Sequence, residues 1–340
     1  MSTLNSSGVR AALTWSLAGL VLFALAACGG TNTTASSSPS AAPSQAAVTT
    51  SPSPTWTPTM SPAPIPAVKP GQKPPPFSEL KKMFAYDKTE PFALREIPNL
   101  EQTVDGVTYR CVTFQSGGEL ASGFLALPKG DGPFPVVVTA PGLGEGGDTS
   151  QGSFFVPQGY ALLALDEPSL AFSLADAQGA IANYVQYGIQ ERRALDLLET
   201  MPEIDARRIG FMGFSNGAIV GALLAGVDER VKAYVFQGVP LLDDQEFKDV
   251  APGKAAWERY VAQMADLDLA AYVGHNKGAA FLFVNGDRDF RAMRSGKALM
   301  AVAPKPRDWY VFAGSHRGPE TVAVGRKMDK YTLDWMVKQL

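Results

Sequence analysis

Short apolar runs alternate with longer amphipathic stretches along the chain from about residue 107 to its end. Polar and apolar residues alternate over residues 107–114. This run and residues 120–127 predict two strands joined in a hairpin through Ser116-Gly117-Gly118. Short runs that are largely apolar predict further strands at residues 135–139, 160–165, 209–212, 231–236, 280–284 and 309–312. Longer stretches predict helices over about residues 174–201 and 320–340. This order of elements predicts an α/β fold, with helices on both faces of a mostly parallel central sheet.

The N-terminal region has a different pattern. Arg10 precedes an uncharged apolar stretch over residues 11–27, which ends in Leu25-Ala26-Ala27-Cys28 and predicts a signal peptide over residues 1–27. The sequence Leu-Ala-Ala-Cys resembles the bacterial lipobox, which implies cleavage before Cys28 and lipid attachment to its sulfur. Two alternatives stay open. One is ordinary signal cleavage after a small residue such as Ala26, and the other is an uncleaved membrane helix, for which the stretch is short of the roughly 20 residues that a span needs.

Residues 28–76 predict a disordered tether. They are mostly Ser, Thr, Ala and Pro, with almost no charge, so they cannot bury enough apolar surface to fold. With a lipid on Cys28, this segment would hold the rest of the chain away from a membrane surface. We therefore expect the protein outside the cytoplasm, at a bacterial cell surface or in the periplasm, with a lipid anchor in the membrane.

Residues 77–340 are long enough to form one domain with a sizeable core. The formal net charge of the whole chain is −3 and no basic cluster is present, which argues against a nucleic-acid partner. Cys111, one of only two cysteines, lies in the alternating run 107–114 and is interpreted as a buried strand residue. The chain has only two histidines, too few for a His-rich catalytic metal site. We expect neither a metal nor a cofactor.

The motif Gly213-Phe214-Ser215-Asn216-Gly217 is the strongest chemical signal. It lies between the apolar run 209–212 and the small-residue run 218–225, as a nucleophile elbow between a buried strand and a packed helix requires. A serine at the tip of this turn has a strained backbone, and glycine two positions away on either side removes a collision. The bare motif also arises by chance in glycine-rich loops, so the flanking elements carry the interpretation. We expect Ser215 to be a nucleophile of acyl transfer.

A serine nucleophile needs a general base, and the two histidines limit the choice. His316 lies in a glycine-flanked loop just after the strand at 309–312, at a carboxyl strand end where a base can face the elbow. His275 precedes the strand at 280–284, at the opposite edge of the sheet, and is interpreted as a surface residue. We therefore expect His316 to be the base.

The base needs an acid to orient it. The strand at 280–284 is followed by Asp287 and Asp289 beside a glycine turn. Asp289 is preferred and Asp287 is the fallback. Either carboxylate could instead pair with a neighbouring arginine, Arg288 or Arg291, or cap the next helix. Asp243 and Asp244 offer a weaker alternative. The chain order Ser215, Asp289, His316 is typical of α/β-sheet hydrolases.

An oxyanion needs backbone N–H groups directed at it. The N–H of Asn216, at the start of the elbow helix, is one candidate. The second is expected in the glycine-rich loop over residues 140–147, where the Leu143 N–H is favoured, although the loop could also be a simple flexible turn.

The chain from about residue 107 resembles the α/β-hydrolase superfamily, and most of all its dienelactone-hydrolase and acyl-esterase branches. Three stretches carry the likeness: residues 205–217, Asn285-Gly286-Asp287-Arg288-Asp289, and Gly314-Ser315-His316. The resemblance implies an α/β-hydrolase fold, and it assigns the acid at the end of a Gly-x-x-Asp turn to Asp289. It also implies that the second oxyanion donor follows the glycine of a His-Gly or Pro-Gly pair, which is Leu143 here.

The chain departs from this family pattern at two positions. Dienelactone hydrolases proper have cysteine at the elbow where this chain has Ser215, which argues against their substrate. The histidine that often precedes the oxyanion glycine is replaced by Pro141.

Residues 239–274 are longer than a simple crossover and carry large apolar residues, so they form either a partial lid or a helical crossover with an apolar core face. Asp166 and Glu167 follow a predicted strand and are left without a role. The sequence thus predicts a serine hydrolase that cleaves carboxylic esters, with a small-molecule ester as substrate. A serine peptidase or amidase, and a non-catalytic surface domain that binds a ligand, are the alternatives.

Overall fold

The computed structural model describes residues 76–340, except for residues 105, 145, 148–149, 169–176 and 243–252. The predicted signal peptide, Cys28 and nearly all of the predicted tether therefore lie outside the described residues. The alternative acids Asp243 and Asp244 lie outside them as well.

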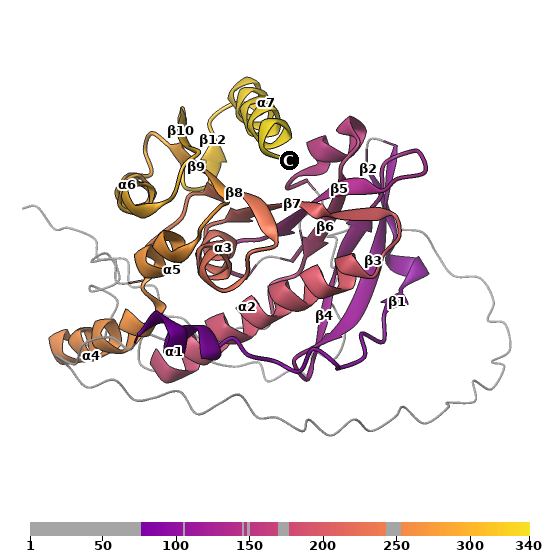
Figure 1. Cartoon of the computed structure of the whole chain (residues 1–340). Coiled ribbons are helices and arrows are strands. Elements are labelled where there is room, and N and C mark those ends of the chain that lie inside the picture. The colour runs from indigo at the N-terminus through magenta and orange to yellow at the C-terminus, as the bar shows by residue number, and fades with distance from the viewer. Residues whose placement is uncertain (1–75, 105, 145, 148–149, 169–176, 243–252) are drawn as a thin grey trace, which may run out of the picture.

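A ten-stranded sheet forms the centre of the domain (Figure 1). Its strand order is β1-β3-β4-β6-β5-β7-β8-β9-β10, and β2 pairs with β3. All neighbours from β6 to β10 are parallel, whereas β3–β4 and β4–β6 are antiparallel. The strands are β1 (Arg95–Glu96), β2 (Gln102–Val104), β3 (Val107–Ser116), β4 (Glu119–Ala126), β5 (Phe134–Ala140), β6 (Ala161–Leu165), β7 (Ile204–Phe214), β8 (Val231–Gln237), β9 (Ala280–Gly286) and β10 (Arg307–Phe312), and a separate two-stranded sheet pairs β11 (Gly314–Ser315) with β12 (Gly318–Pro319).

Helices cover both faces of the sheet (Figure 1). The larger core lies under α1 (Phe77–Lys82), α2 (Ala177–Glu199), α3 (Asn216–Val227), α4 (Lys254–Met264), α5 (Leu269–His275) and α6 (Phe290–Val302). The smaller core lies on the other face, under the 3₁₀ helix η2 (Ser153–Gln158) and α7 (Val322–Gln339). Two further 3₁₀ turns are η1 (Pro98–Leu100) and η4 (Ala265–Leu267).

Residues of one strand contribute to the two cores in turn. In β9, Phe281 and Phe283 pack into the larger core, and Leu282 and Val284 pack into the smaller one. Side chains of a strand alternate between the faces, so a strand buried on both sides is apolar throughout. The expected α/β fold with a mostly parallel sheet is confirmed.

The strand before the elbow is longer than the predicted run 209–212. β7 begins at Ile204, and its first half contains Asp205, whose carboxylate accepts hydrogen bonds from Arg207 Nε at 3.0 Å and Arg208 Nε at 2.8 Å. These charged residues interrupt the apolar pattern without ending the strand. The short strands β1, β2, β11 and β12 were likewise not predicted from the sequence, whereas the hairpin turn between β3 and β4 was.

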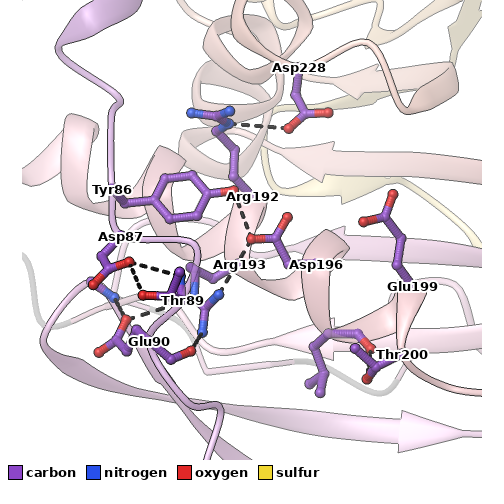
Figure 2. Close-up of polar contacts among 12 residues, drawn as sticks. Tyr86, Asp87, Thr89, Glu90, Arg192, Arg193, Asp196, Glu199, Thr200 and Asp228 are labelled. Atoms are coloured by element: carbon purple, nitrogen blue, oxygen red, sulfur yellow. Dashed lines mark hydrogen bonds and ion pairs between the residues drawn. The ribbon is translucent and has the colours of Figure 1, made fainter.

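A buried polar cluster attaches the segment before β1 to helix α2 (Figure 2). Arg193 on α2 is completely buried, and its Nη2 donates to the backbone oxygen of Glu90 at 2.7 Å. The Glu90 carboxylate accepts from the N–H groups of Gly117 and Gly118, at 2.8 and 3.1 Å, in the turn of the β3–β4 hairpin. The N-terminal segment thus connects α2 to the antiparallel end of the sheet.

Tyr86 extends this cluster along α2 (Figure 2). Its hydroxyl donates to Asp196 at 2.8 Å, and the Arg192 guanidinium lies 4.8 Å from its ring centroid. Burial, together with the hydrogen bond to Asp196, raises the pKa of Tyr86 to about 12. The phenol therefore keeps its proton and remains a donor throughout the neutral range.

The Arg193 Nε lies 3.8 Å from the Glu90 Oε2, and both side chains are buried. The change Arg193→Met is expected to lower the free energy of unfolding by about 3–5 kcal/mol, because it leaves the buried Glu90 carboxylate without this cation. Urea denaturation, with the m-value checked for constancy, measures the effect. The matched control is Arg110→Met, which breaks the half-exposed pair between Arg110 Nη1 and Glu96 Oε1 at 2.6 Å and should cost less than about 1 kcal/mol. Equal losses in the two variants would contradict a special role for the buried cluster.

Candidate active site

The backbone at Ser215 has the shape of a nucleophile elbow. Ser215 lies between the end of β7 and the start of α3, with φ of +50° and ψ of −107°. A Cβ on Gly213 would lie 2.4 Å from the Gly217 oxygen, and one on Gly217 would lie 2.1 Å from the Ala140 oxygen. Only glycine fits at these two positions, so the spacing in the motif follows from steric necessity.

Ser215 and His316 meet at the edge of the sheet where its parallel strands have their carboxyl ends. The Ser215 Oγ lies 2.9 Å from the His316 Nε2. The distance between these two atoms permits proton transfer from the serine hydroxyl to the imidazole. His316 directly follows β11, and its ring centroid lies 5.4 Å from that of Phe214.

Asp289 lies on the other side of the His316 ring. The Asp289 Oδ2 is 2.6 Å from the His316 Nδ1. An ionised carboxylate can only accept hydrogen bonds, so the His316 tautomer that fits this contact has its proton on Nδ1. Its Nε2 is then free to accept a hydrogen bond from the Ser215 hydroxyl. The structure therefore brings the three residues favoured by the sequence into one line of hydrogen bonds.

The carboxylate of Asp289 serves two partners. Its Oδ1 accepts from the Ala292 N–H at 3.1 Å and caps α6, so the helix cap considered in the sequence accompanies the contact with His316. Burial opposes ionisation of Asp289, but the hydrogen bonds from His316 and Ala292 outweigh it, and the pKa of Asp289 lies below its ordinary value. Asp289 is therefore a carboxylate at neutral pH.

The other acid and the other histidine have different neighbours. The Asp287 Oδ1 accepts from the Gly314 N–H at 2.9 Å and so fixes the chain just before His316. Arg288 pairs with Glu320 at 2.9 Å. His275 is exposed at the end of α5, where its ring stacks on Phe77 at 3.7 Å between centroids.

Two backbone hydrogen bonds orient the start of α3. The Ser215 N–H donates to the Gln237 oxygen at 2.9 Å, and the Gly217 N–H donates to the Pro141 oxygen at 2.8 Å. The Asn216 N–H lies between them in the first turn of the helix. The loop after β5 that contains Leu143 is thus in direct contact with the elbow, as an oxyanion hole built from both segments requires.

Glu167, which the sequence left without a role, lies at this junction. One carboxylate oxygen accepts from the side-chain amide of Asn216, and the other accepts from the Gly144 N–H. The Asn216 Oδ1 in turn accepts from the Tyr184 hydroxyl at 2.9 Å. An acidic pair directly after a buried strand was the available signal, but it did not indicate which groups these carboxylates contact.

A cavity of about 460 Å³ opens beside the triad, between η2 and α7. Phe214 and Arg317, the sequence neighbours of Ser215 and His316, form part of its wall. The other lining residues are Ser150, Gln151, Gly152, Phe154, Met212, Gln237, Gly318, Pro319, Gly325, Met328 and Asp329. The cavity has the size of a small-molecule site.

The described part of the segment 239–274 packs on the core. Trp257, Tyr260 and Met264 of α4 are buried in the larger core, so this part is a helical crossover with an apolar inner face. Residues 243–252 lie outside the described residues, and a partial lid, the other alternative for this segment, stays an untested expectation.

Among the described residues, no group of three or more His, Cys, Asp or Glu side chains is arranged to hold a metal ion. Within the same ranges, no helix combines the length and the apolarity needed to cross a membrane.

The order of the strands and the elbow between β7 and α3 are those of the α/β-hydrolase fold. Solved structures with the same fold include the acetyl xylan esterase from Paenibacillus sp. R4, with a TM-score of 0.62 and 17% identity over 78% of this chain and 93% of that one. Acetyl xylan esterase 1 from Thermoanaerobacterium sp. JW/SL YS485 has the same TM-score, with 16% identity over 79% and 96% of the two chains. A dienelactone hydrolase from Anabaena variabilis ATCC 29413 reaches 0.52, with 16% identity over 69% and 99%. These likenesses establish the fold.

The sequence comparisons are more specific. Residues 98–266 match the family described as "Esterase FrsA-like". Esterase FrsA of Enterobacter sp. (strain 638) is 35% identical over 130 residues, and Esterase FrsA of Klebsiella pneumoniae (strain 342) is 34% identical over 130 residues. Each match covers 36% of this chain and 29% of the relative. The family match includes Ser215 and Leu143 but ends before Asp289 and His316.

The change Asp289→Asn is expected to lower kcat/KM roughly 10³–10⁴-fold, because an amide that donates to Nδ1 favours the wrong tautomer of His316. Hydrolysis of a chromogenic ester, followed alongside thermal unfolding, measures the loss. The comparison variant is Asp287→Asn, which weakens only the contact with the Gly314 N–H and should cost less than about 10-fold. A larger loss in Asp287→Asn than in Asp289→Asn would make Asp287 the acid.

Proposed function

We propose that this protein is a serine hydrolase that cleaves carboxylic esters through an acyl-enzyme intermediate. The observation that carries the proposal is the line of hydrogen bonds from Ser215 through His316 to Asp289 at a strained elbow. The family description and the names of its relatives, all esterases, support an ester as the scissile group. A small-molecule ester is the proposed substrate.

Acylation begins with proton transfer. His316 Nε2 takes the proton of the Ser215 hydroxyl as the oxygen attacks the ester carbonyl carbon, and a tetrahedral oxyanion forms. Asp289 holds Nδ1 and stabilises the imidazolium. The backbone N–H groups of Leu143 and Asn216 are the proposed donors to the oxyanion.

Collapse of the tetrahedral intermediate breaks the bond to the alcohol oxygen. His316 returns its proton to that oxygen, the alcohol leaves, and the acyl group stays on Ser215 as an ester. A water molecule then repeats the sequence: His316 accepts its proton, the hydroxide adds to the acyl carbon, and the proton passes to the Ser215 oxygen as the acid is released. The enzyme returns to its starting state.

The assignment to a dienelactone-hydrolase and acyl-esterase branch is the finer part of the proposal. The turn from Gly286 to Asp289 and the fold of the Anabaena variabilis dienelactone hydrolase support it. The serine at position 215 favours ordinary carboxylic esters over the substrate of enzymes with a cysteine elbow.

We also propose that the mature protein begins at Cys28, carries a lipid on that sulfur and is located outside the cytoplasm. The sequence Leu25-Ala26-Ala27-Cys28 behind an apolar stretch supports this proposal. The Ser/Thr/Ala/Pro-rich residues 28–76 would then link the anchor to the catalytic domain.

Matched substrates separate esterase from amidase activity. We expect the p-nitrophenyl ester of a given acyl group to be cleaved with a higher kcat/KM than the p-nitroanilide of the same acyl group. We expect Ser215→Ala to lose ester hydrolysis by roughly 10³-fold or more. Greater turnover of the anilide would instead indicate an amidase.

Labelling with a fluorophosphonate probe supplies a second readout of the same proposal. Mass spectrometry should find one adduct on the peptide that contains Ser215. A folded protein that neither reacts with the probe nor hydrolyses the esters would be a binding domain rather than an enzyme.

The lipid anchor is tested by expressing the full chain in a bacterium that processes lipoproteins. We expect the protein in the membrane fraction with a lipid-modified Cys28 as its first residue, and Cys28→Ala in the soluble extracytoplasmic fraction. An unmodified N-terminus at another residue would contradict the proposal. A disulfide between Cys28 and Cys111, the two cysteines of the chain, would exclude a lipid thioether as well.

A further inference from the structure

We propose that Glu167 is a positioning residue that fixes the geometry of the oxyanion hole by holding the loop after β5 against the start of α3. The proposal rests on the esterase function proposed above. Glu167 follows β6, which pairs with β5 in the sheet. Its carboxylate is therefore fixed by a strand that contributes neither the nucleophile nor the oxyanion donors.

Glu167 binds the loop through the residue next to the proposed donor. The Gly144 N–H donates to one carboxylate oxygen of Glu167, and Gly144 directly follows Leu143. The preceding carboxylate holds the same loop at a second point, where the Gly147 N–H donates to the Asp166 Oδ1 at 2.6 Å. Two consecutive acidic residues thus hold the loop at two points, Gly144 and Gly147.

The second oxygen of Glu167 binds the elbow helix. It accepts from the side-chain amide of Asn216, whose backbone N–H is the other proposed oxyanion donor. Asn216 is buried, and the Tyr184 hydroxyl donates to its Oδ1 at 2.9 Å. One carboxylate therefore connects the two residues whose N–H groups must converge on one oxygen.

The loop requires such a connection because its own side chains supply little packing. It is rich in glycine, Gly144 has φ of +75°, and Leu143 is 53% exposed. A glycine-rich segment loses much conformational entropy when it is ordered. Hydrogen bonds to a charged acceptor are stronger than those to a neutral one, so Glu167 can keep the loop in a single conformation.

Glu167 also accepts hydrogen bonds from two donors that would otherwise compete with the oxyanion hole for the substrate oxygen. With the Gly144 N–H and the Asn216 amide both directed at the carboxylate, the two backbone donors of Leu143 and Asn216 are left for the substrate oxygen. A preorganised hole stabilises the transition state without rearranging during the reaction. Loss of Glu167 should therefore affect kcat rather than substrate binding.

The test compares Glu167→Ala and Glu167→Gln with the wild type and with Glu119→Ala, an exposed control at the start of β4. Hydrolysis of one p-nitrophenyl ester is measured per active site, counted by complete titration with a fluorophosphonate. An alkyl boronic acid, which forms a tetrahedral adduct on the serine, reports on the oxyanion hole. The pH dependence of kcat/KM is recorded for each variant.

We expect Glu167→Ala to lower kcat per titrated site roughly 10–100-fold and to change KM less than about 3-fold. Inhibition by the boronic acid should weaken by about the same factor as the loss of kcat. The pH dependence should keep its shape, because Glu167 does not contact His316. Glu167→Gln should recover most of the activity, since glutamine has the same length and can bridge both partners once the Asn216 amide turns. If Glu167→Ala does not fold, Glu167→Asp, which is one methylene too short to reach both donors, replaces it.

Three results would overturn the proposal. The first is a wild-type kcat per titrated site in Glu167→Ala. The second is a lower number of titratable sites and a lower Tm, with kcat per site unchanged, which describes a structural role alone. The third is an altered pH profile with Glu167→Gln as inactive as Glu167→Ala, which indicates that the charge acts on the protonation of the catalytic groups and not through the position of the loop. Each of these leaves the proposed function standing when Ser215→Ala is inactive, whereas ester hydrolysis by Ser215→Ala would refute the proposed function itself.

Discussion

The strained backbone of Ser215 is the constraint on which the rest of the site depends. A non-glycine residue at φ of +50° costs on the order of 1–3 kcal/mol and persists only where its surroundings enforce it. Here the Ser215 N–H is held by β8 through Gln237, and the next turn is held by the loop after β5 through the bond from Gly217 to Pro141. The central parallel strands supply the rigidity, because they are buried on both faces. The strain directs the serine oxygen out of the sheet and toward the base.

The sheet also explains why residues distant in sequence meet at Ser215. Parallel strands end at the same edge, so the turns after β9 and β10 lie beside the elbow. Small contacts then set the detail: Asp287 fixes Gly314 just before His316, and Asp289 divides its oxygens between His316 and the α6 cap. On the other side of the serine, Glu167 has the corresponding task for the oxyanion loop. The triad and the oxyanion hole are thus positioned by separate carboxylates.

Much of this arrangement could be predicted from the sequence because the strongest constraints are local. Gly213 avoids a collision with the Gly217 oxygen, within five residues, whereas Gly217 avoids one with the Ala140 oxygen on the neighbouring strand β5. The choice of His316 over His275 follows from which end of a strand each one occupies. The residues alone did not decide between Asp289 and Asp287, because the two side chains differ in direction but share the same sequence context. The contacts of Glu167 were not predictable, since its partners come from a loop and a helix start whose approach depends on the folded sheet. The early part of β7 was missed because its charged residues satisfy one another within the strand.

The acyl-enzyme on Ser215 is the central claim, and its direct detection is the most decisive measurement. The protein is mixed with a slowly hydrolysed ester, quenched in acid during turnover and mapped by peptide mass spectrometry. The account predicts a peptide that carries the mass of the acyl group on Ser215 and that disappears as the substrate is exhausted. Continued ester hydrolysis with no acyl group on Ser215 at any time during turnover, or with the acyl group on another residue, would contradict it.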